Sequence, residues 1–407
     1  MIKRPEILAP AGDMESLRAA LNYGADAVYL AGKQFGMRSA PKNFDSDDLR
    51  EACRLAHEKG RKIYVTCNVL PRNRELADLP GFLSYAQECG VDAFIIADLG
   101  VLELAKQYAP EVALHISTQA GVTNYAAANA LYKMGASRVV LAREIPIDEI
   151  AEIRANIPGD LEIECFVHGA MCVSFSGRCL ISSYLTGRDA NHGDCAQPCR
   201  WKYHLYEEKR EGQFFPVEED GSGTYLYNSR DMCMIGHIPE LVRAGVSSLK
   251  IEGRAKSAYY TAVVTNAYRH AVDDFMREGE AFTLKPWITE ELEKISHREY
   301  STGFYLGGEP GQAVHSGGYI RHYNQVAVCE ENIDDSTAVI TQRNKFCVGD
   351  VLDVLPPDGI PRLVRCLSLT NEAGDEVESA PHPMERLTIK TDNPIPAGSV
   401  IRLKLNQ

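Results

Sequence analysis

The feature that constrains the fold most is a short phrase that recurs four times along the chain. In each copy a glycine and a small residue lead into a largely apolar run, which reads AVYL, AFII, RVVL or SLKI, at residues 24–30, 90–96, 135–141 and 245–251. The preceding segments have helical spacing, as in the stripe of Phe82, Ala86 and Cys89 before Gly90. Glycine suits the left-handed position just past a helix end, and a continuously apolar strand is typical of a parallel sheet. The repeat therefore predicts helix–loop–strand units.

Counting every run of this kind gives eight expected strands, at residues 6–11, 27–31, 62–67, 93–98, 113–117, 138–142, 163–168 and 248–252. The intervals between them are long enough to hold at least one helix each. Strand–helix alternation repeated eight times is typical of a (β/α)8 TIM-like barrel, which is an α/β fold. A doubly wound sheet is the alternative, although no G-x-G-x-x-G phrase follows the first strand.

The sequence pattern changes along the chain. We expect the (β/α)8 barrel at 1–280, interrupted after the seventh strand by a Cys-rich insertion at 170–234. A polar connector with a short helix and a glycine-rich stretch follows at 281–322. From 323 to 407, short β-rich runs alternate with turn signals such as Pro-Pro-Asp-Gly, which predicts a small all-β barrel as a separate C-terminal domain.

Composition points to a cytoplasmic enzyme. The chain has 12 cysteines, most of them isolated inside apolar segments, which fits a reducing compartment better than a disulfide scaffold. We see no signal peptide and no run of membrane-spanning length. A net charge of −13 argues against broad nonspecific binding of nucleic acid. One local basic cluster could still bind nucleic acid, although an ordinary solvated loop explains it as well. Its members are Arg178, Arg188, Arg200, Lys202, Lys209 and Arg210.

Four cysteines within the insertion are candidate ligands: Cys172, Cys179, Cys195 and Cys199. Thiolates so close in sequence usually share a metal ion or an iron–sulfur cluster. Small core residues or disulfide partners are the alternatives. Cys233 is a fifth candidate, although core packing explains it equally well. The insertion follows the seventh strand, and active sites of this fold lie at the carboxyl ends of the strands. This placement favours a functional cluster over a structural zinc site.

Polar residues also fall at or near the expected strand ends: Arg38, Asn68, Asp98, Gln119, Arg143, Glu144, His168, Glu252 and Arg254. On the seventh strand, Glu164 and His168 share a face because side chains alternate along a strand. His168, Glu164 and Glu252 are our candidates for catalysis. The alternatives are that Glu164 is a deep barrel residue neutralised by an arginine or lysine, and that His168 makes a structural hydrogen bond.

These motifs resemble a known family. The phrase ECFVHGAMC at 164–172, followed by Gly177, Cys179 and Ser182, resembles the signature of the collagenase-like peptidase family U-32. The resemblance runs along nearly the whole chain, through LAPAGD, the segment 38–44, NSRD, LKIEGR and STGFYLG. Within the family, the C-terminal barrel and the segment SLKIEGRAKSAYY are most similar to members that hydroxylate tRNA.

The resemblance implies a function that the residues alone do not. It implies hydroxylation of the wobble uridine to 5-hydroxyuridine, with the tRNA anticodon loop and prephenate as substrates and a related partner subunit in some relatives. It favours a [4Fe–4S] cluster on the four cysteines, while His168 and His192 keep a Cys/His zinc site open. Prephenate is a dicarboxylate, so we expect guanidinium partners and select Arg38, Arg143 and Arg254. The C-terminal barrel and the basic stretch at 200–210 are expected to hold the RNA backbone.

Two other classes of function remain as alternatives. A peptidase is disfavoured, because the chain has no H-E-x-x-H or G-x-S-x-G motif. Ser247 and Lys250 straddle the eighth strand and are expected on opposite faces, which argues against a catalytic dyad. The other alternative is a scaffold that docks RNA or protein and carries a purely structural metal site.

Overall fold

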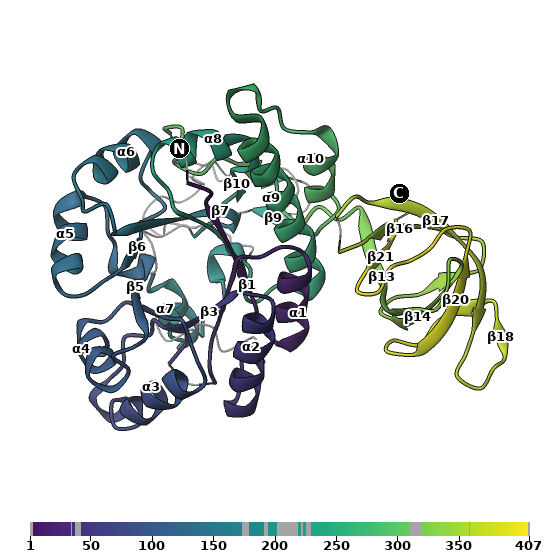
Figure 1. Ribbon diagram of the computed structural model, residues 1–407, viewed down its shortest axis with the longest axis horizontal. Helices are drawn as coiled ribbons and strands as arrows, with labels where there is room; N and C mark the ends of the chain where they lie inside the picture. Colours follow the sequence, from purple (N-terminus) through teal and green to yellow (C-terminus); the bar gives the residue numbers. More distant parts are fainter. Residues whose placement is uncertain are drawn as a thin grey trace, which may run out of the picture.

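A computed structural model describes residues 3–33, 35–36, 42–172, 179–190, 194–201, 219–220, 223–224, 229–308, 319–357 and 359–405. Figure 1 shows these residues as two bodies. The larger is a barrel of strands ringed by helices, and the smaller is a β-barrel built from the C-terminal part of the chain.

Eight parallel strands form the larger barrel: β1 (Glu6–Pro10), β2 (Ala27–Leu30), β3 (Lys62–Cys67), β4 (Ala93–Ile96), β5 (Ala113–Ile116), β6 (Arg138–Val140), β7 (Glu162–Ala170) and β11 (Ser248–Ile251). They follow one another in chain order, and β11 pairs with both β1 and β7, so the sheet closes. The predicted (β/α)8 barrel is confirmed at all eight strand positions. The closing pair excludes an open, doubly wound sheet.

The helices around this barrel are amphipathic segments between the strands: α1 (Met14–Asn22), α2 (Ser46–Glu58), α3 (Leu79–Glu88), α4 (Leu99–Tyr108), α5 (Tyr125–Lys133), α6 (Ile147–Ala155), α8 (Ile238–Arg243) and α9 (Ala258–Glu278). The repeated glycines act as expected, since Gly90 and Gly245 lie in the left-handed region at φ 87° and 90°. Among the described residues, no helix combines the length and the apolar character needed to span a bilayer.

Two short strands in this sheet, β10 (Asp231–Cys233) and β12 (Tyr300–Ser301), were not predicted. Strand β10 runs antiparallel to the carboxyl half of β7, with Cys233 opposite His168. It pairs in turn with β12. A three-residue strand with one charged and two apolar residues has too little periodicity to be recognised in the sequence. This addition extends the sheet beyond β7, next to the point where the Cys-rich insertion leaves the barrel.

The amino-terminal end of the barrel interior is filled by ion pairs. Arg138 donates to Glu6 at 2.6 Å, to Glu162 at 2.6 Å and to Glu164 at 3.1 Å. Burial alone would raise the pKa of Glu6, but Arg138 outweighs that effect and the pKa lies below its ordinary value. Three carboxylates therefore share one guanidinium at this end of the barrel.

Six antiparallel strands form the C-terminal barrel: β13 (Tyr323–Asn332), β14 (Thr337–Gln342), β16 (Val351–Leu355), β17 (Arg362–Thr370), β20 (Arg386–Thr391) and β21 (Val400–Lys404). The pairing of β16 with β17 closes the sheet, which confirms the predicted small β-barrel. Shorter strands add to it or pair beside it: β15 (Phe346–Cys347), β18 (Glu376–Val377) and β19 (Ser379–Ala380).

Buried polar contacts fix the smaller barrel to the larger one, beside α1 in Figure 1. The Tyr23 hydroxyl, at the end of α1, donates to the Leu355 carbonyl at 2.7 Å. On the other side, the fully buried Arg402 of β21 donates to Glu291 of α10 (Pro286–Leu292) at 2.7 Å and also bonds Asp353. Lys294 completes this group with a 2.7 Å bond to Asp353.

Candidate functional site

The carboxyl ends of β7 and β11 come together very closely. Gly169 has φ 108°, and a Cβ added there would lie 2.5 Å from the main-chain oxygen of Glu252. No other residue fits this contact without moving one of the strands. The two chain segments that carry His168, Glu252 and Arg254 are therefore held side by side, at the end of the barrel where this fold places its active sites.

Four buried tyrosine hydroxyls hold these strand ends in place. Each donates to a main-chain carbonyl of β7 or of the end of β11: Tyr29 to Ile251 at 2.9 Å, Tyr260 to Glu252 at 2.8 Å, Tyr268 to Val167 at 2.7 Å and Tyr305 to Phe166 at 2.7 Å. The pairing of β7 with β11 shifts register at this point, so that Lys250 is opposite Phe166 but Ile251 is opposite His168. The hydroxyls thus bond the main chain on both strands at this register shift.

Arg143 lies between the two strand ends. Its guanidinium is 3.8 Å from the centre of the Phe166 ring and donates to the Ala170 carbonyl at 2.9 Å. A second nitrogen is 3.6 Å from the Glu252 carboxylate, and both side chains are mostly buried. The structure thus brings together two of the predicted site residues, Arg143 and Glu252, as an ion pair at the carboxyl end of the barrel.

Arg254 lies on the same end of the barrel, towards β3. It is 4% exposed and donates to the Thr66 hydroxyl at 2.7 Å. Its guanidinium also lies close to Gly36, since a Cβ added at Gly36 would be 3.4 Å from it. Arg38, the third predicted arginine, lies outside the described residues. Asp98 has a local role, because its carboxylate caps α4 by accepting the Val101 N–H at 3.0 Å.

Glu164 lies deeper in the barrel than the other candidates. It is fully buried and accepts bonds from Lys250 at 2.7 Å and from Arg138 at 3.1 Å. This is the arrangement expected of a barrel carboxylate neutralised by cationic neighbours. Sequence reasoning identified neither Arg138 nor Lys250 as a partner. The Lys250 ammonium group is in an ion pair with Glu164, which argues further against a catalytic dyad with Ser247.

His168 lies inside a cage of aromatic rings. The ring centres of Tyr260, Tyr268 and Tyr300 lie 6.1, 5.7 and 5.3 Å from that of His168. The side chain is 1% exposed, and its Nδ1 atom has no hydrogen-bond partner among the described residues. Burial lowers the pKa of His168 to about 3, with Asp231 acting weakly in the opposite direction. At neutral pH this imidazole is uncharged.

The low pKa of His168 predicts a dependence of stability on pH. A histidine titrates near 6.5 when unfolded, so below this value the unfolded chain binds a proton that the folded chain excludes until about pH 3. His168 alone should therefore lower the free energy of unfolding by about 1.4 kcal/mol for each unit that the pH falls below 6.5. Between pH 6.5 and pH 5 the loss is about 2 kcal/mol. Urea denaturation of the wild type and His168→Phe at the two pH values measures the difference in slope. His382→Gln, at an exposed histidine, is the control and should leave the slope unchanged.

The four predicted cysteine ligands lie along the insertion. Cys172 follows β7 and is exposed, and Cys179 is half-buried just before α7 (Ile181–Thr186). Cys195 and Cys199 are also half-buried, and the segment that holds them is tied to α7 by a bond from the Ala196 N–H to the Ser182 hydroxyl at 3.0 Å. The sulfur of Cys195 accepts the Gln197 N–H at 3.3 Å, a bond of the kind that tunes sulfur ligands of iron–sulfur clusters.

These cysteines fit a cluster in donor type. Among the described residues, however, no three side chains of histidine, cysteine, aspartate or glutamate lie close enough together to hold a metal ion. His192, the possible nitrogen ligand, lies outside the described residues.

Cys233, the fifth candidate, is on β10 opposite His168. Its side chain packs against the core of the larger barrel. Burial raises the pKa of Cys233 to about 11. This environment is that of a protonated thiol packed in the core, which is the alternative that the sequence left open for this residue.

The predicted basic cluster is described only in part. Arg188 forms an ion pair with Asp194 at 2.7 Å, within the insertion. Four members of the cluster lie outside the described residues, as does the side chain of Arg200: Arg178, Lys202, Lys209 and Arg210.

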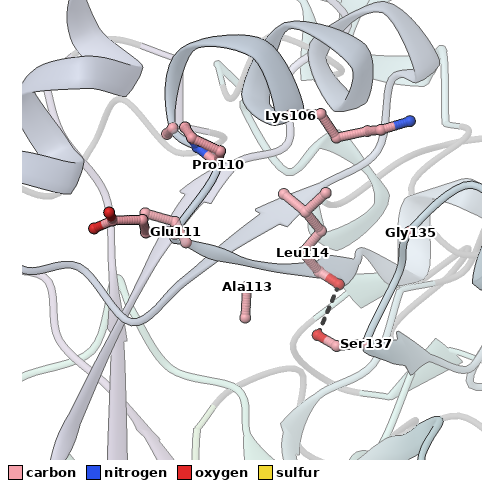
Figure 2. A pocket seen from close by; sticks show the side chains of 9 residues that line it. Lys106, Pro110, Glu111, Ala113, Leu114, Gly135 and Ser137 are labelled. Atoms are coloured by element: carbon pink, nitrogen blue, oxygen red, sulfur yellow. Dashed lines mark hydrogen bonds between the residues drawn. The ribbon is translucent and has the colours of Figure 1, made fainter.

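A pocket lies at the other end of the barrel. Figure 2 shows this pocket of about 420 Å³, with Lys106, Pro110 and Glu111 from the segment before β5 and Ser137 from the segment before β6. The Ser137 hydroxyl donates to the Leu114 carbonyl at 3.2 Å. These residues precede their strands, so the pocket opens on the amino-terminal face. Because this fold places its chemistry on the opposite face, the pocket is separate from the candidate site.

Comparison with known proteins gives the same organisation. A sequence model described as "Peptidase family U32" matches residues 12–315, and one described as "Peptidase family U32 C-terminal domain" matches residues 321–402. The chain is 36% identical to tRNA hydroxylation protein P1 of Bacillus subtilis over 407 residues, which cover 98% of this chain and 95% of that one. It is 37% identical to tRNA hydroxylation protein P of Escherichia coli, covering 88% and 87%. A 23S rRNA 5-hydroxycytidine synthase of Escherichia coli is 37% identical, covering 76% of this chain and 46% of that one.

Proposed function

The chain belongs to peptidase family U32, and from that premise we propose that it hydroxylates RNA, converting the wobble uridine of tRNA to 5-hydroxyuridine. One observation carries the proposal. The similarity to tRNA hydroxylation protein P1 extends through both barrels, over 98% of this chain. A second relative, which matches 76% of this chain, is named for 5-hydroxycytidine synthesis in 23S rRNA, so hydroxylation of RNA is common to the names of both.

The arginines at the carboxyl end of the barrel support prephenate as a co-substrate. Arg143 and Arg254 both lie beside the end of β11, one on the side of β7 and the other on the side of β3. Two guanidinium groups suit a dicarboxylate, because each can present two parallel N–H groups to one carboxylate. Arg38 belongs to the same set in our proposal.

A base of the anticodon loop can enter a pocket at low energetic cost. The anticodon loop is single-stranded, so its wobble base can turn into a pocket at a much lower cost than a base in a duplex. The reaction replaces the C5–H bond of uracil with a C5–OH bond, a two-electron oxidation whose oxygen donor is a co-substrate and not a residue of this chain. In our proposal, Glu252 lies at the mouth of that pocket, where it orients the base, and the tyrosine-bonded ends of β7 and β11 form a rigid wall.

We also propose that Cys172, Cys179, Cys195 and Cys199 would hold a [4Fe–4S] cluster. When bound, such a cluster would supply electron-transfer chemistry to the site. Structural zinc on the same residues is the alternative, and metal and sulfide analysis distinguishes the two.

The proposal is tested by nucleoside analysis of tRNA from cells that lack this chain. We expect 5-hydroxyuridine and its derivatives to disappear and to return when the wild-type chain is restored. A reconstituted reaction with purified chain and unmodified tRNA should depend on added prephenate. Unchanged nucleosides in the deletion strain, or hydrolysis of gelatin by protein free of other proteases, would contradict RNA hydroxylation.

Replacing Arg143 by lysine tests the role proposed for the guanidinium. Lysine keeps the positive charge but loses the second parallel donor, which costs one charge-assisted hydrogen bond to the carboxylate. We expect the KM for prephenate to rise about ten- to hundred-fold while tRNA affinity is unchanged. Arg243→Lys is the control, since Arg243 pairs with Glu280 on the surface of α8. An equal rise in both variants would rule out a specific role for Arg143.

A further inference from the structure

Two cations contact the ring of Phe166 inside the larger barrel. The guanidinium carbon of Arg143 lies 3.8 Å from the ring centre, and the ammonium nitrogen of Lys250 lies 5.3 Å from it. Phe166 is 4% exposed, so water screens these contacts little. The face of an aromatic ring carries partial negative charge and attracts a cation within about 6 Å of its centre. Phe166 therefore contributes electrostatic attraction as well as apolar packing.

The two cations belong to different parts of the barrel. Lys250 is in the ion pair with Glu164, which precedes Phe166 by two residues on β7. Arg143 donates to the carbonyl of Ala170, the last residue of the same strand. The ring of Phe166 thus lies between the buried ion pairs of the interior and the arginine at the carboxyl end of the barrel.

Three contacts orient the Arg143 guanidinium. One nitrogen donates to the Ala170 carbonyl at 2.9 Å, a second lies 3.6 Å from the Glu252 carboxylate, and the ring of Phe166 lies against the central carbon. A guanidinium stacks on an aromatic face, and such a contact limits the tilt of its plane. A bidentate bond to a carboxylate depends on the orientation of that plane. Losing the ring should therefore weaken carboxylate binding even though the positive charge remains.

A tyrosine of the connector holds Phe166 and the Arg143 loop together. The Tyr305 hydroxyl donates to the Phe166 carbonyl at 2.7 Å, and the Tyr305 carbonyl accepts the Ile147 N–H at 3.0 Å. Ile147 is the first residue of α6 and follows Arg143 by four residues. Tyr305 belongs to the STGFYLG phrase. This phrase thus fixes β7 and the loop after β6 relative to one another.

We propose that Phe166 is a positioning residue for the co-substrate, because its ring holds the Arg143 guanidinium in the orientation that binds a carboxylate of prephenate. This inference deepens the proposed function and rests on it. Phe166 acts through Arg143 and does not itself touch prephenate. Apolar packing of a core ring is the competing explanation, and it predicts a loss of stability without a selective loss of prephenate affinity.

Kinetics of Phe166→Leu in the reconstituted reaction test this role. Leucine keeps an apolar side chain but has no ring face. We expect the KM for prephenate to rise about two- to thirty-fold, which corresponds to the loss of one cation–ring contact. The kcat at saturating prephenate and the KM for tRNA should stay at their wild-type values, since the contact is made equally in the ground state and the transition state. Phe166→Tyr keeps the ring and should retain the wild-type KM.

Phe94→Leu is the matched control, because Phe94 is fully buried on β4 and packs in the apolar core. It loses the same atoms, so its Tm should fall as that of Phe166→Leu does while the KM for prephenate is unchanged. A wild-type KM in Phe166→Leu, or an equal rise in both leucine variants, would overturn the positioning role. A KM as high in Phe166→Tyr as in Phe166→Leu would overturn it too, since the ring would then not be the group that matters.

Thermal unfolding of a double variant separates this inference from the proposed function. Arg143→Met removes the guanidinium that the ring contacts. The losses of Tm in Phe166→Leu and Arg143→Met should therefore be less than additive when the two are combined. Additive losses would overturn the contact, whatever reaction the chain catalyses. A reaction that needs no prephenate would instead contradict the proposed co-substrate, and the double variant would still decide whether Phe166 holds Arg143.

Discussion

Cys179→Ala is expected to lose both bound iron and 5-hydroxyuridine formation. Cys179 is half-buried directly before α7, on the segment that connects the signature phrase to the Cys195 region. Iron–sulfur clusters are held by cysteine thiolates, and alanine offers no replacement ligand. Wild-type chain purified without oxygen should contain about four iron and four sulfide per molecule with the absorption of a [4Fe–4S] protein. The variant should contain neither, and cells that carry it should have tRNA without the modification.

Cys347→Ala is the control for this experiment. Cys347 is half-buried like Cys179 but lies on β15 in the C-terminal barrel, so its loss should leave iron, sulfide and modification unchanged. Zinc without sulfide in the wild-type chain would mean that the cysteines form a structural zinc site. Full modification in Cys179→Ala would show that hydroxylation does not depend on these cysteines.

Four of the eight barrel strands could be predicted from the repeat, which combines two independent signals. Its glycine marks the end of the preceding helix, and the buried strand that follows is apolar on both faces. The other four strands were predicted from their apolar runs. The C-terminal barrel was predictable for a different reason, since turns separate its alternating strands. Strand β10 carries neither signal, and its position depends on pairing with β7 across the whole insertion.

The sequence predicted which strands carry the candidate site, but it could not predict the contacts between those strands. Alternation correctly placed Glu164 inside the barrel, where it meets Arg138 and Lys250. It was wrong for His168, because the register of β7 against β11 shifts after Lys250 and His168 lies opposite Ile251, on the face that packs against α9 and β12. The partners of Glu164 are 26 and 86 residues away in the sequence, on β6 and β11, and only barrel closure brings them together. Likewise, the tyrosines around His168 come from α9 and β12, in segments with no motif that points to a histidine. The environment that makes His168 neutral is therefore a property of the fold.

Glu164→Ala is expected to lower the free energy of unfolding by about 3 to 5 kcal/mol. The carboxylate is fully buried and compensates two cations, Lys250 at 2.7 Å and Arg138 at 3.1 Å. Lys250 is only 4% exposed, so removing Glu164 leaves a buried ammonium group without its ion-pair partner. Removing one partner of a buried pair costs much more free energy than replacing both. Urea denaturation at neutral pH measures the loss. Glu162→Ala is the control, since Glu162 also binds Arg138 but is 34% exposed, so we expect a loss of at most about 1 kcal/mol.

A double variant separates the structural role of Glu164 from a catalytic one. Replacing both partners, in Glu164→Met with Lys250→Met, removes the two opposite charges together and should recover most of the stability lost in Glu164→Ala. If Glu164 acts only through the ion pair, a stable double variant should also retain hydroxylation. If the double variant is as stable as the wild type but inactive, one of these two groups takes part in the reaction. That result would move the reacting centre from the carboxyl ends of the strands to the middle of the barrel, beside Phe166, where the Lys250 ammonium group lies 5.3 Å from the ring centre.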